Sequence, residues 1–257
     1  LLLSGERGDK KLSAVLLCKE DCVLAGIEIF KRVYQQIDRN VTFRTYFKDG
    51  RVLKKGTKVL EVTSTLRNLL EGERTSLNFL QRMSGIATLS NSFVRKLKFK
   101  DSKILHTRKT TPNFRLFEAA AVKTGGGDFH RLSLGSSVMI KDNHIEALGS
   151  IDKVLRYLKL RQKKLTRNQK QKFEIEVRTF REIDSVIKLC KGLVRVVMLD
   201  NFQPGKIEKA INLLKYHGFK IEISGGINPG NFAKYQKKGV DFYSIGMLTH
   251  SYRSCDF

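Results

Sequence analysis

The sequence predicts an α/β protein with two domains, and three observations support this prediction. Beyond residue 100, short apolar runs alternate with segments of helical periodicity. Glycines stand where the helices of this second part should end. The first hundred residues instead combine closely spaced strand signals with long helices. We therefore expect domains at 1–100 and 101–257, with a C-terminal tail that packs back on the first domain.

The first domain is expected to be an α+β unit. Its strand signals are short runs of apolar and β-branched residues, at 15–18, 23–25, 41–47 and 58–63. A helix is expected over 27–37, where apolar residues recur at helical spacing. Two longer helices should follow, over 66–80 and 86–98. Ser84 and Gly85 lie between them and are expected to form the break.

Strand–helix repeats are expected in the second domain. The strands are short apolar runs at 173–177, 194–199, 221–223 and 242–245. Helices with apolar residues three and four apart are expected over 180–190, 207–216 and 232–237. The glycines that should end these helices are Gly192, Gly218 and Gly239. Elements that alternate in this way form a parallel sheet with right-handed crossovers.

Two earlier strands, at 103–106 and 137–140, bring the expected number to six, which favours a barrel over an open, doubly wound sheet. In either architecture the carboxyl ends of the strands gather at one edge, where active sites are built. Residues able to do chemistry follow the ends of these runs: Arg108, Lys109, Lys141, Glu176, Asp200, Ser224 and Ser244. We therefore expect one functional rim.

The formal net charge of +24 restricts the class of partner. Nucleic acid, an anionic membrane and a multiply anionic substrate would each attract such a protein. Most phenylalanines lie within apolar runs, which indicates core and not an exposed nucleic-acid groove. No apolar run approaches the roughly 20 residues that span a bilayer. We expect no nucleic-acid or membrane partner, and we interpret the basic segment 159–172 as a solvated helix end and loop.

Cysteine usage indicates a reducing compartment. The four cysteines, Cys18, Cys22, Cys190 and Cys255, show no CxxC spacing and no neighbouring histidine cluster. Neither a zinc site nor a disulfide framework is expected from this pattern. Leu1 to Leu3 are too short for the core of a signal peptide. The expected location is the cytoplasm.

Five side chains could give the rim a positive field. Arg108 and Lys109 end the first strand of the second domain, and an arginine there can hold a planar carboxylate through two hydrogen bonds. His130 and Arg131 follow three consecutive glycines, which allow close approach of the backbone. Lys141 directly follows an apolar run. A surface turn or a flexible loop would explain each cluster alone, but together they suit a ligand with two carboxylates.

Two further groups on the rim suit a sugar phosphate. Glu176 and Asp200 end consecutive strands, and a pair of carboxylates suits Mg²⁺ or the hydroxyls of a ribose; a structural ion pair is the alternative. Small residues follow the last two strands and could cradle a phosphate through backbone N–H groups. They are Ser224, Gly225, Gly226, Ser244 and Gly246.

Eight motifs, in the same order along the chain, resemble the quinolinate phosphoribosyltransferase family. They cover nearly the whole chain and include TRKTTP (107–112), GGG-x-x-HR (125–131), MIKDNH (139–144) and SGGI (224–227). The others are ERTSLNFLQ with SGIAT (73–88), EIEV (174–177), MLDN (198–201) and SIG (244–246). The main departure is Arg178, which stands where relatives carry an acidic or small residue.

The resemblance implies a type II phosphoribosyltransferase fold, with an N-terminal α/β sandwich and an incomplete TIM-like α/β barrel. It also implies an enzyme that transfers phosphoribose from phosphoribosyl pyrophosphate to quinolinate with loss of CO₂, giving nicotinate mononucleotide for NAD biosynthesis. A homodimer or larger homo-oligomer is expected, with Arg74 completing the neighbouring site. The alternatives are transfer to nicotinate without decarboxylation and a molybdenum-transport-associated relative.

Roles for the site residues follow from the same resemblance. The catalytic residues would be Lys109, Lys141, Glu176 and Asp200, with Glu176 and Asp200 also binding Mg²⁺. Quinolinate would be bound by Arg74, Thr107, Arg108, Lys109, His130, Arg131 and Lys141. The phosphoribosyl pyrophosphate would be bound by Glu176, Asp200, Ser224, Gly225, Gly226, Ser244 and Gly246.

Overall fold

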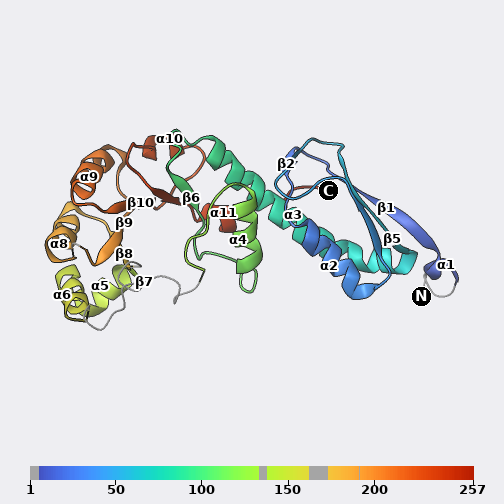
Figure 1. The fold of residues 1–257 in the computed structure, drawn as a ribbon, viewed down its shortest axis with the longest axis horizontal. Helices are drawn as coiled ribbons and strands as arrows, with labels where there is room; N and C mark the ends of the chain where they lie inside the picture. The colour runs from blue at the N-terminus through green and yellow to red at the C-terminus, as the bar shows by residue number, and fades with distance from the viewer. Residues whose placement is uncertain (1–5, 133–137, 162–172, 191) are drawn as a thin grey trace. The chain divides into compact units, whose positions relative to one another are not determined.

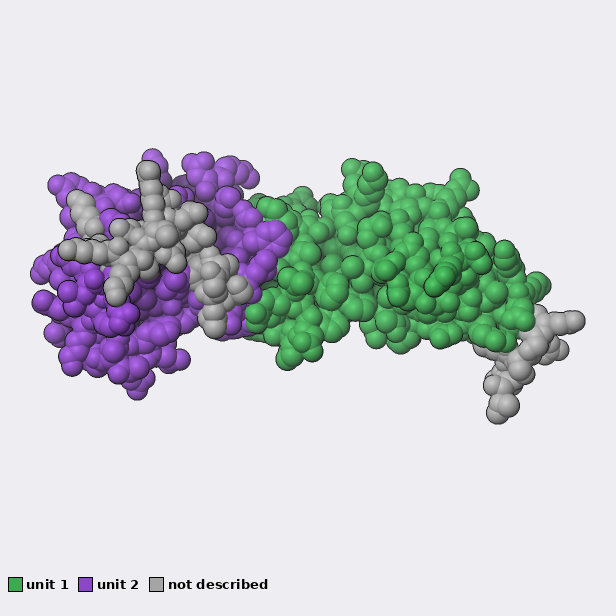
Figure 2. Space-filling view, turned by 60° about the horizontal axis from the view of Figure 1, so that its bottom comes forward, with its two compact units in different colours: residues 1–95, 110–127, 248–257 green, residues 96–109, 128–247 purple. Residues whose placement is uncertain are grey.

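The computed structural model describes residues 6–132, 138–161, 173–190 and 192–257. The chain divides into two compact units, which are drawn in green and purple in Figure 2. The first unit contains Leu1–Arg95, Thr110–Gly127 and Leu248–Phe257. The second contains Lys96–Lys109 and Asp128–Met247. The start of the strand expected at 137 and the basic residues 162–172 lie outside the described part of the chain.

The first unit is built on a three-stranded antiparallel sheet in the order β1–β5–β3 (Figure 1). The bounds are Lys11–Leu17 for β1, Thr42–Thr45 for β3 and Lys58–Thr65 for β5. Two short strands, β2 (Cys22–Val23) and β4 (Val52–Leu53), pair with each other. Helix α1 spans Glu6–Asp9. Helix α2 (Ile27–Ile37) buries Ile27, Phe30 and Tyr34, which lie on one face because they are three and four residues apart.

Helix α3 runs unbroken over Leu66–Arg95, so the expected break at 84–85 is wrong. Gly85 is inside the helix because the C-terminal tail packs against it: a Cβ there would lie 3.0 Å from the carbonyl carbon of Arg253. The Ser84 hydroxyl donates a hydrogen bond to the Ala25 carbonyl. Both residues serve tertiary packing, which local propensity does not reveal.

The last residues of the chain belong to the core of the first unit. Cys255 and Phe257 are buried among the side chains of its sheet and helices. The Cys255 N–H donates to the Gln81 carbonyl, and the Lys19 N–H donates to the Asp256 carbonyl. These contacts explain why Leu248–Phe257 groups with this unit.

A second part of the expected barrel domain, Thr110–Gly127, also groups with the first unit. It contains α4 (Arg115–Thr124), whose buried Glu118 accepts a hydrogen bond from Arg82 Nε of α3 at 3.0 Å. A Cβ on Gly125 would lie 2.8 Å from the Cβ of Ser90, so glycine allows α4 and α3 to pack closely. The single boundary expected near residue 100 therefore does not describe this segment.

The second unit contains one parallel sheet of six strands in the order β6–β11–β10–β9–β8–β7 (Figure 1). The strands are β6 (Lys103–Leu105), β7 (Val138–Ile140), β8 (Phe173–Val177), β9 (Val194–Asp200), β10 (Lys220–Ser224) and β11 (Phe242–Ser244). The sheet ends at β6 and β7, which are not paired with each other. This arrangement confirms the prediction of an incomplete α/β barrel after an N-terminal α/β domain.

The two faces of this sheet differ in chemistry. Helices follow the outer side of the curved sheet in Figure 1: α5 (Asp142–Leu148), α6 (Ile151–Arg161), α8 (Phe180–Cys190), α9 (Pro204–Tyr216) and α10 (Phe232–Tyr235), and α11 spans Met247–His250. One alternating set of strand residues is apolar and almost fully buried, as expected under helices: Ile104, Ile175, Val177, Val197, Leu199, Ile221, Ile223 and Tyr243. The other set includes the polar residues of the candidate site.

None of the helices that the structure describes is long and apolar enough to cross a membrane.

Candidate active site

The carboxyl ends of three neighbouring strands align in register. Asp200, Ser224 and Ser244 are the last residues of β9, β10 and β11, and Ser224 pairs with both of the others. Side chains of paired residues in a parallel sheet point to the same face. The sheet therefore brings a carboxylate and two hydroxyls together at one rim.

Glu176 and Asp200 lie on either side of the Arg178 guanidinium. Arg178 Nη2 is 3.3 Å from Glu176 Oε1, and Arg178 Nε is 3.4 Å from Asp200 Oδ2. Burial, and then the negative charge of Asp200, raises the pKa of Glu176. The two carboxylates predicted from consecutive strand ends are thus close enough to repel each other, and a cation between them relieves this repulsion.

Lys141 joins the same group from the next strand. It directly follows β7 and precedes α5, and its Nζ lies 3.3 Å from Glu176 Oε2. Its backbone N–H donates to His144 Nδ1 at 3.0 Å, which fixes the chain where the helix begins. The lysine side chain is partly exposed at this rim.

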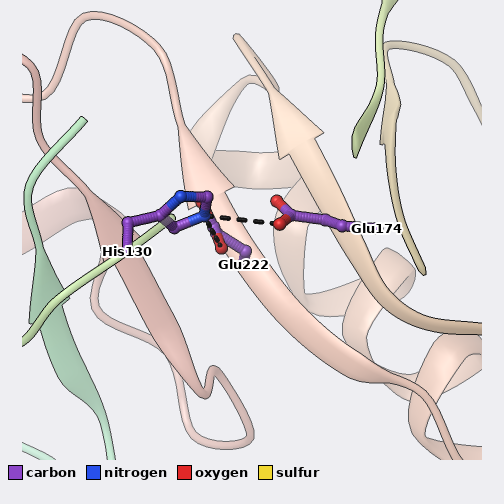
Figure 3. Close-up of side chains that lie close together, drawn as sticks. All are labelled: His130, Glu174 and Glu222. Carbon is purple, nitrogen blue, oxygen red and sulfur yellow. Dashed lines mark ion pairs between the residues drawn. The ribbon is translucent and has the colours of Figure 1, made fainter. Parts of the chain in front are cut away.

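A buried ionic cluster lies deeper on the polar face (Figure 3). His130 Nε2 is 3.3 Å from Glu174 Oε2 and 3.4 Å from Glu222 Oε2, from β8 and β10. Burial alone would lower the pKa of His130, but its hydrogen bonds to the two glutamates raise it to about 10. Burial, and then the charge of Glu222, raises the pKa of Glu174 to about 7.

The spacing of His130, Glu174 and Glu222 would also suit a metal ion, since all three ligand atoms lie within 4.8 Å of one another. The same atoms already pair with one another, however, since His130 Nε2 contacts a carboxylate oxygen of each glutamate. The cluster is therefore an ion-paired support that holds the segment after the three glycines against the inner side of the sheet.

Replacing His130 by glutamine should destabilise the protein in a pH-dependent way. The folded pKa of about 10 exceeds the unfolded value of about 6.5, so the contribution of the imidazolium is complete below pH 6.5 and is lost as the pH rises through 10. We expect a deficit of about 3 kcal/mol in the free energy of unfolding at pH 6, because the two buried glutamates lose the cation to which both are hydrogen-bonded. Urea unfolding at pH 6 and pH 10.5 should show a smaller deficit at the higher pH. A deficit that does not change with pH would contradict this account.

Arg131 and Arg108 lie near each other on the same unit. Burial, and then the positive charge of Arg108, lowers the pKa of Arg131. Arg131 Nη2 also lies 3.4 Å from Met139 Sδ of β7, two residues before Lys141. Two guanidinium groups held together at a partly buried rim create a site for an anion with more than one negative charge.

The structure places the remaining predicted substrate residues, Thr107, Lys109 and Arg74, at two locations. Thr107 and Lys109 flank Arg108 in the loop after β6, where the Lys109 N–H donates to Thr107 Oγ1. Lys109 is exposed and Thr107 is partly buried. Arg74 is exposed on α3 of the first unit, whereas Arg108, His130, Arg131 and Lys141 all belong to the second unit.

The loop after β10 requires glycine at its first position. Gly225 has a φ of +96°, and a Cβ there would overlap Asn201 Oδ1 and lie 2.7 Å from the Asn201 N atom. Gly226 has a φ of +59° and nothing within 4 Å of its Cβ position. The buried Ser244 hydroxyl has no hydrogen-bond partner among the described residues. This end of the sheet thus has open space beside Gly226 and a buried hydroxyl that no described group satisfies.

Substituting Gly225 by alanine should cost about 2 kcal/mol in stability, because it combines a strained φ with a backbone clash. The matched control is Gly226→Ala, which should cost about 1 kcal/mol because it meets only the left-handed backbone penalty. The midpoints of urea unfolding of the two variants check this order. Equal midpoints would show that Asn201 moves aside freely.

Sequence reasoning did not assign a role to three charged groups of this face: Glu174, Glu222 and Asp142. Glu174 and Glu222 are buried charged residues, each with an apolar strand residue on either side in the sequence. A carboxylate at such a position needs a cation, and this signal could have paired them with His130. Asp142 was part of a recognised motif but was not expected to contact Arg178, 36 residues away; Arg178 Nη2 lies 2.7 Å from its Oδ2.

Comparison with known proteins identifies the family. Residues 3–84 match the N-terminal domain of quinolinate phosphoribosyl transferase, and residues 86–257 match its C-terminal domain. The chain is 35% identical over 254 residues to a probable nicotinate-nucleotide pyrophosphorylase [carboxylating] of Archaeoglobus fulgidus, covering 96% of this chain and 93% of the relative. The corresponding protein of Bacillus subtilis is 37% identical over 249 residues, or 97% of this chain and 83% of the relative.

A solved structure agrees with this assignment. The crystal structure of NadC from Streptococcus pyogenes superposes with a TM-score of 0.87 at 39% sequence identity, and the match covers 98% of this chain and 86% of that one. Both domain matches, the level of identity and the shared fold lead to one conclusion: the chain belongs to the quinolinate phosphoribosyltransferase family.

Proposed function

We propose that the protein transfers phosphoribose from phosphoribosyl pyrophosphate to quinolinate and releases CO₂ and pyrophosphate, giving nicotinate mononucleotide for NAD biosynthesis. The observation that carries this proposal is the distribution of charge on one unit. Arg108 and Arg131 form a cationic pair, whereas Glu176 and Asp200 form an acidic pair in which Glu176 contacts Lys141. A dianionic acceptor and a sugar phosphate donor need such opposite surroundings.

Quinolinate suits the cationic side. Its two ring carboxylates would be held by Arg108, Arg131 and Lys141, and a guanidinium can bind a carboxylate through two parallel hydrogen bonds. His130 supports this side, because its imidazolium is buried between two glutamates and fixes the neighbouring Arg131. Thr107 and Lys109 complete the proposed pocket from the loop after β6.

The donor suits the opposite side. Its 5′-phosphate would bind Ser224, Gly225, Gly226, Ser244 and Gly246, for which the open backbone of Gly226 and the unpartnered hydroxyl of Ser244 give support. Glu176 and Asp200 fit a divalent cation because they come from adjacent strands and already enclose a positive group, the Arg178 guanidinium. When bound, Mg²⁺ would neutralise the charge that develops on the pyrophosphate as it leaves.

The reaction then follows from positioning and electrostatics. The cationic side chains hold quinolinate so that its ring nitrogen faces the anomeric carbon, where the C–N bond forms as the C–O bond to pyrophosphate breaks. Glu176 and Asp200 stabilise positive charge on the ribose, and Lys141 orients Glu176. The ribosylated ring is cationic and accepts the electron pair left by the departing CO₂, and a proton takes the place of the lost carboxylate.

Incubation of the protein with phosphoribosyl pyrophosphate, Mg²⁺ and quinolinate labelled in the carboxylate next to the ring nitrogen tests this proposal. We expect nicotinate mononucleotide and labelled CO₂ in equal amounts. The alternative acceptor, nicotinate, would give the same nucleotide without CO₂. If neither quinolinate nor nicotinate gives product, the enzymatic proposal is rejected. The molybdenum-transport-associated relative is then the alternative that remains.

We also propose a homodimer or larger homo-oligomer in which the exposed Arg74 reaches the site of a neighbouring copy. Sedimentation would test the oligomeric state. Recovery of activity on mixing an Arg74→Ala chain with an inactive Lys141→Ala chain would test the role of Arg74.

The proposed location is the cytoplasm, since the four cysteines are buried free thiols. A plant relative, from Arabidopsis thaliana, is described as chloroplastic.

A further inference from the structure

Arg178 makes ion pairs with three carboxylates of the candidate site. Its Nη2 lies 2.7 Å from Asp142 Oδ2 and 3.3 Å from Glu176 Oε1, and its Nε lies 3.4 Å from Asp200 Oδ2. These acids come from the start of α5 and from two adjacent strands, β8 and β9. One guanidinium therefore contacts all three of these carboxylates and offsets part of their negative charge.

The Arg178 side chain reaches solvent, whereas its backbone is fixed. The backbone N–H donates to Glu182 Oε2 at 2.6 Å, and the N–H of Thr179 donates to the same oxygen, where α8 begins. The side chain itself is half exposed, and so is that of its tightest partner, Asp142. Glu176 and Asp200, in contrast, are largely buried. The arginine can therefore leave the two buried carboxylates and remain paired with Asp142 in solvent.

We propose that Arg178 is a resident counter-ion which a divalent cation must displace in order to bind between Glu176 and Asp200. Both cations need the same oxygen atoms, because Glu176 Oε1 and Asp200 Oδ2 are the atoms that Arg178 contacts. Asp200 Oδ2 also accepts a hydrogen bond from Asn201 Nδ2 at 2.8 Å, which holds that oxygen in place. The substrate-free protein thus keeps its acidic pair neutralised and binds the metal weakly. This inference rests on the proposed metal role of the two acids.

Titration of the substrate-free full chain with Mn²⁺ alone, followed by the electron paramagnetic resonance signal of the free ion, tests the proposal. Removing the guanidinium in Arg178→Gln should tighten Mn²⁺ binding by at least about tenfold, since two neighbouring carboxylates then lose the cation that they share. Arg178→Lys should fall between this variant and the natural protein, because an ammonium cannot contact three carboxylates at once. Both variants keep the backbone hydrogen bond to Glu182, so the start of α8 is retained.

The matched control is Arg181→Gln, which removes the same charge from an exposed position three residues away on α8. Its Mn²⁺ affinity should stay within about twofold of the natural protein, because an exposed charge is screened by solvent. In the double variant Glu176→Gln/Arg178→Gln the gain should disappear. Unchanged or weaker binding in Arg178→Gln would overturn the proposal, as would a gain that survives loss of Glu176, because Arg178 would then only hold the acids together.

This titration is independent of the test of the proposed function. A natural protein that forms nicotinate mononucleotide while Arg178→Gln binds Mn²⁺ no more tightly would reject the counter-ion role alone. A protein that forms no nucleotide while Arg178→Gln binds Mn²⁺ at least about tenfold more tightly would reject the proposed reaction alone.

Discussion

Replacing Arg108 by alanine is expected to lower kcat/KM for quinolinate by at least about 100-fold, or roughly 2.7 kcal/mol of transition-state stabilisation. Arg108 lies close enough to Arg131 to lower its pKa, and we expect the two guanidinium groups to bind one anionic ligand. Loss of one removes a two-point contact to a ring carboxylate and leaves the other carboxylate misplaced relative to the donor. Initial rates at varied quinolinate and saturating phosphoribosyl pyrophosphate measure this effect.

Two control variants accompany this measurement, one at the same position and one at an exposed arginine elsewhere. Arg108→Lys keeps the charge but loses the planar fork, and we expect it to recover only part of the lost efficiency. Arg156→Ala removes an exposed arginine of α6 and should leave kcat/KM unchanged within about twofold. Near-normal turnover in Arg108→Ala would remove this residue from the mechanism.

Replacing Lys141 by alanine is expected to have an effect of similar size, again at least about 100-fold in kcat/KM. Lys141 Nζ lies 3.3 Å from Glu176 Oε2. Its loss removes a cation from the acceptor pocket and leaves Glu176 with one positive partner fewer. We expect kcat to fall more than KM rises, because the Glu176 carboxylate must be oriented when positive charge develops on the ribose.

The control for Lys141 is Lys153→Ala, which removes an exposed lysine of the neighbouring helix α6. It should retain the natural rate, since the two variants lose the same charge and differ only in location. Should Lys141→Ala change KM alone, with kcat preserved, Lys141 would be a binding residue that does not orient Glu176.

Local signals were sufficient to predict much of the second unit. Helix α8 begins at Phe180 and ends at Cys190, as its apolar spacing indicated, and β8 matches its apolar run. The strand ends placed Glu176, Asp200, Ser224 and Ser244 at one rim, because every parallel strand points the same way.

Contacts between distant segments could not be predicted in the same way. Gly85 indicated a break in α3 by its propensity, yet it is glycine because the C-terminal tail packs on it. The pairing of His130 with Glu174 and Glu222 depends on curvature of the sheet, which brings together residues more than 40 positions apart. Arg178 was seen only as a departure from the family pattern, since its contact with Asp142 is set by the adjacent positions of β7 and β8.

A crystal structure of the protein with quinolinate would show whether these three cations receive both ring carboxylates. We expect oxygen atoms of the two carboxylates to lie within about 3.2 Å of nitrogen atoms of Arg108, Arg131 and Lys141, with the ring nitrogen facing Glu176 and Asp200. Quinolinate bound with both carboxylates away from these three cations would contradict it.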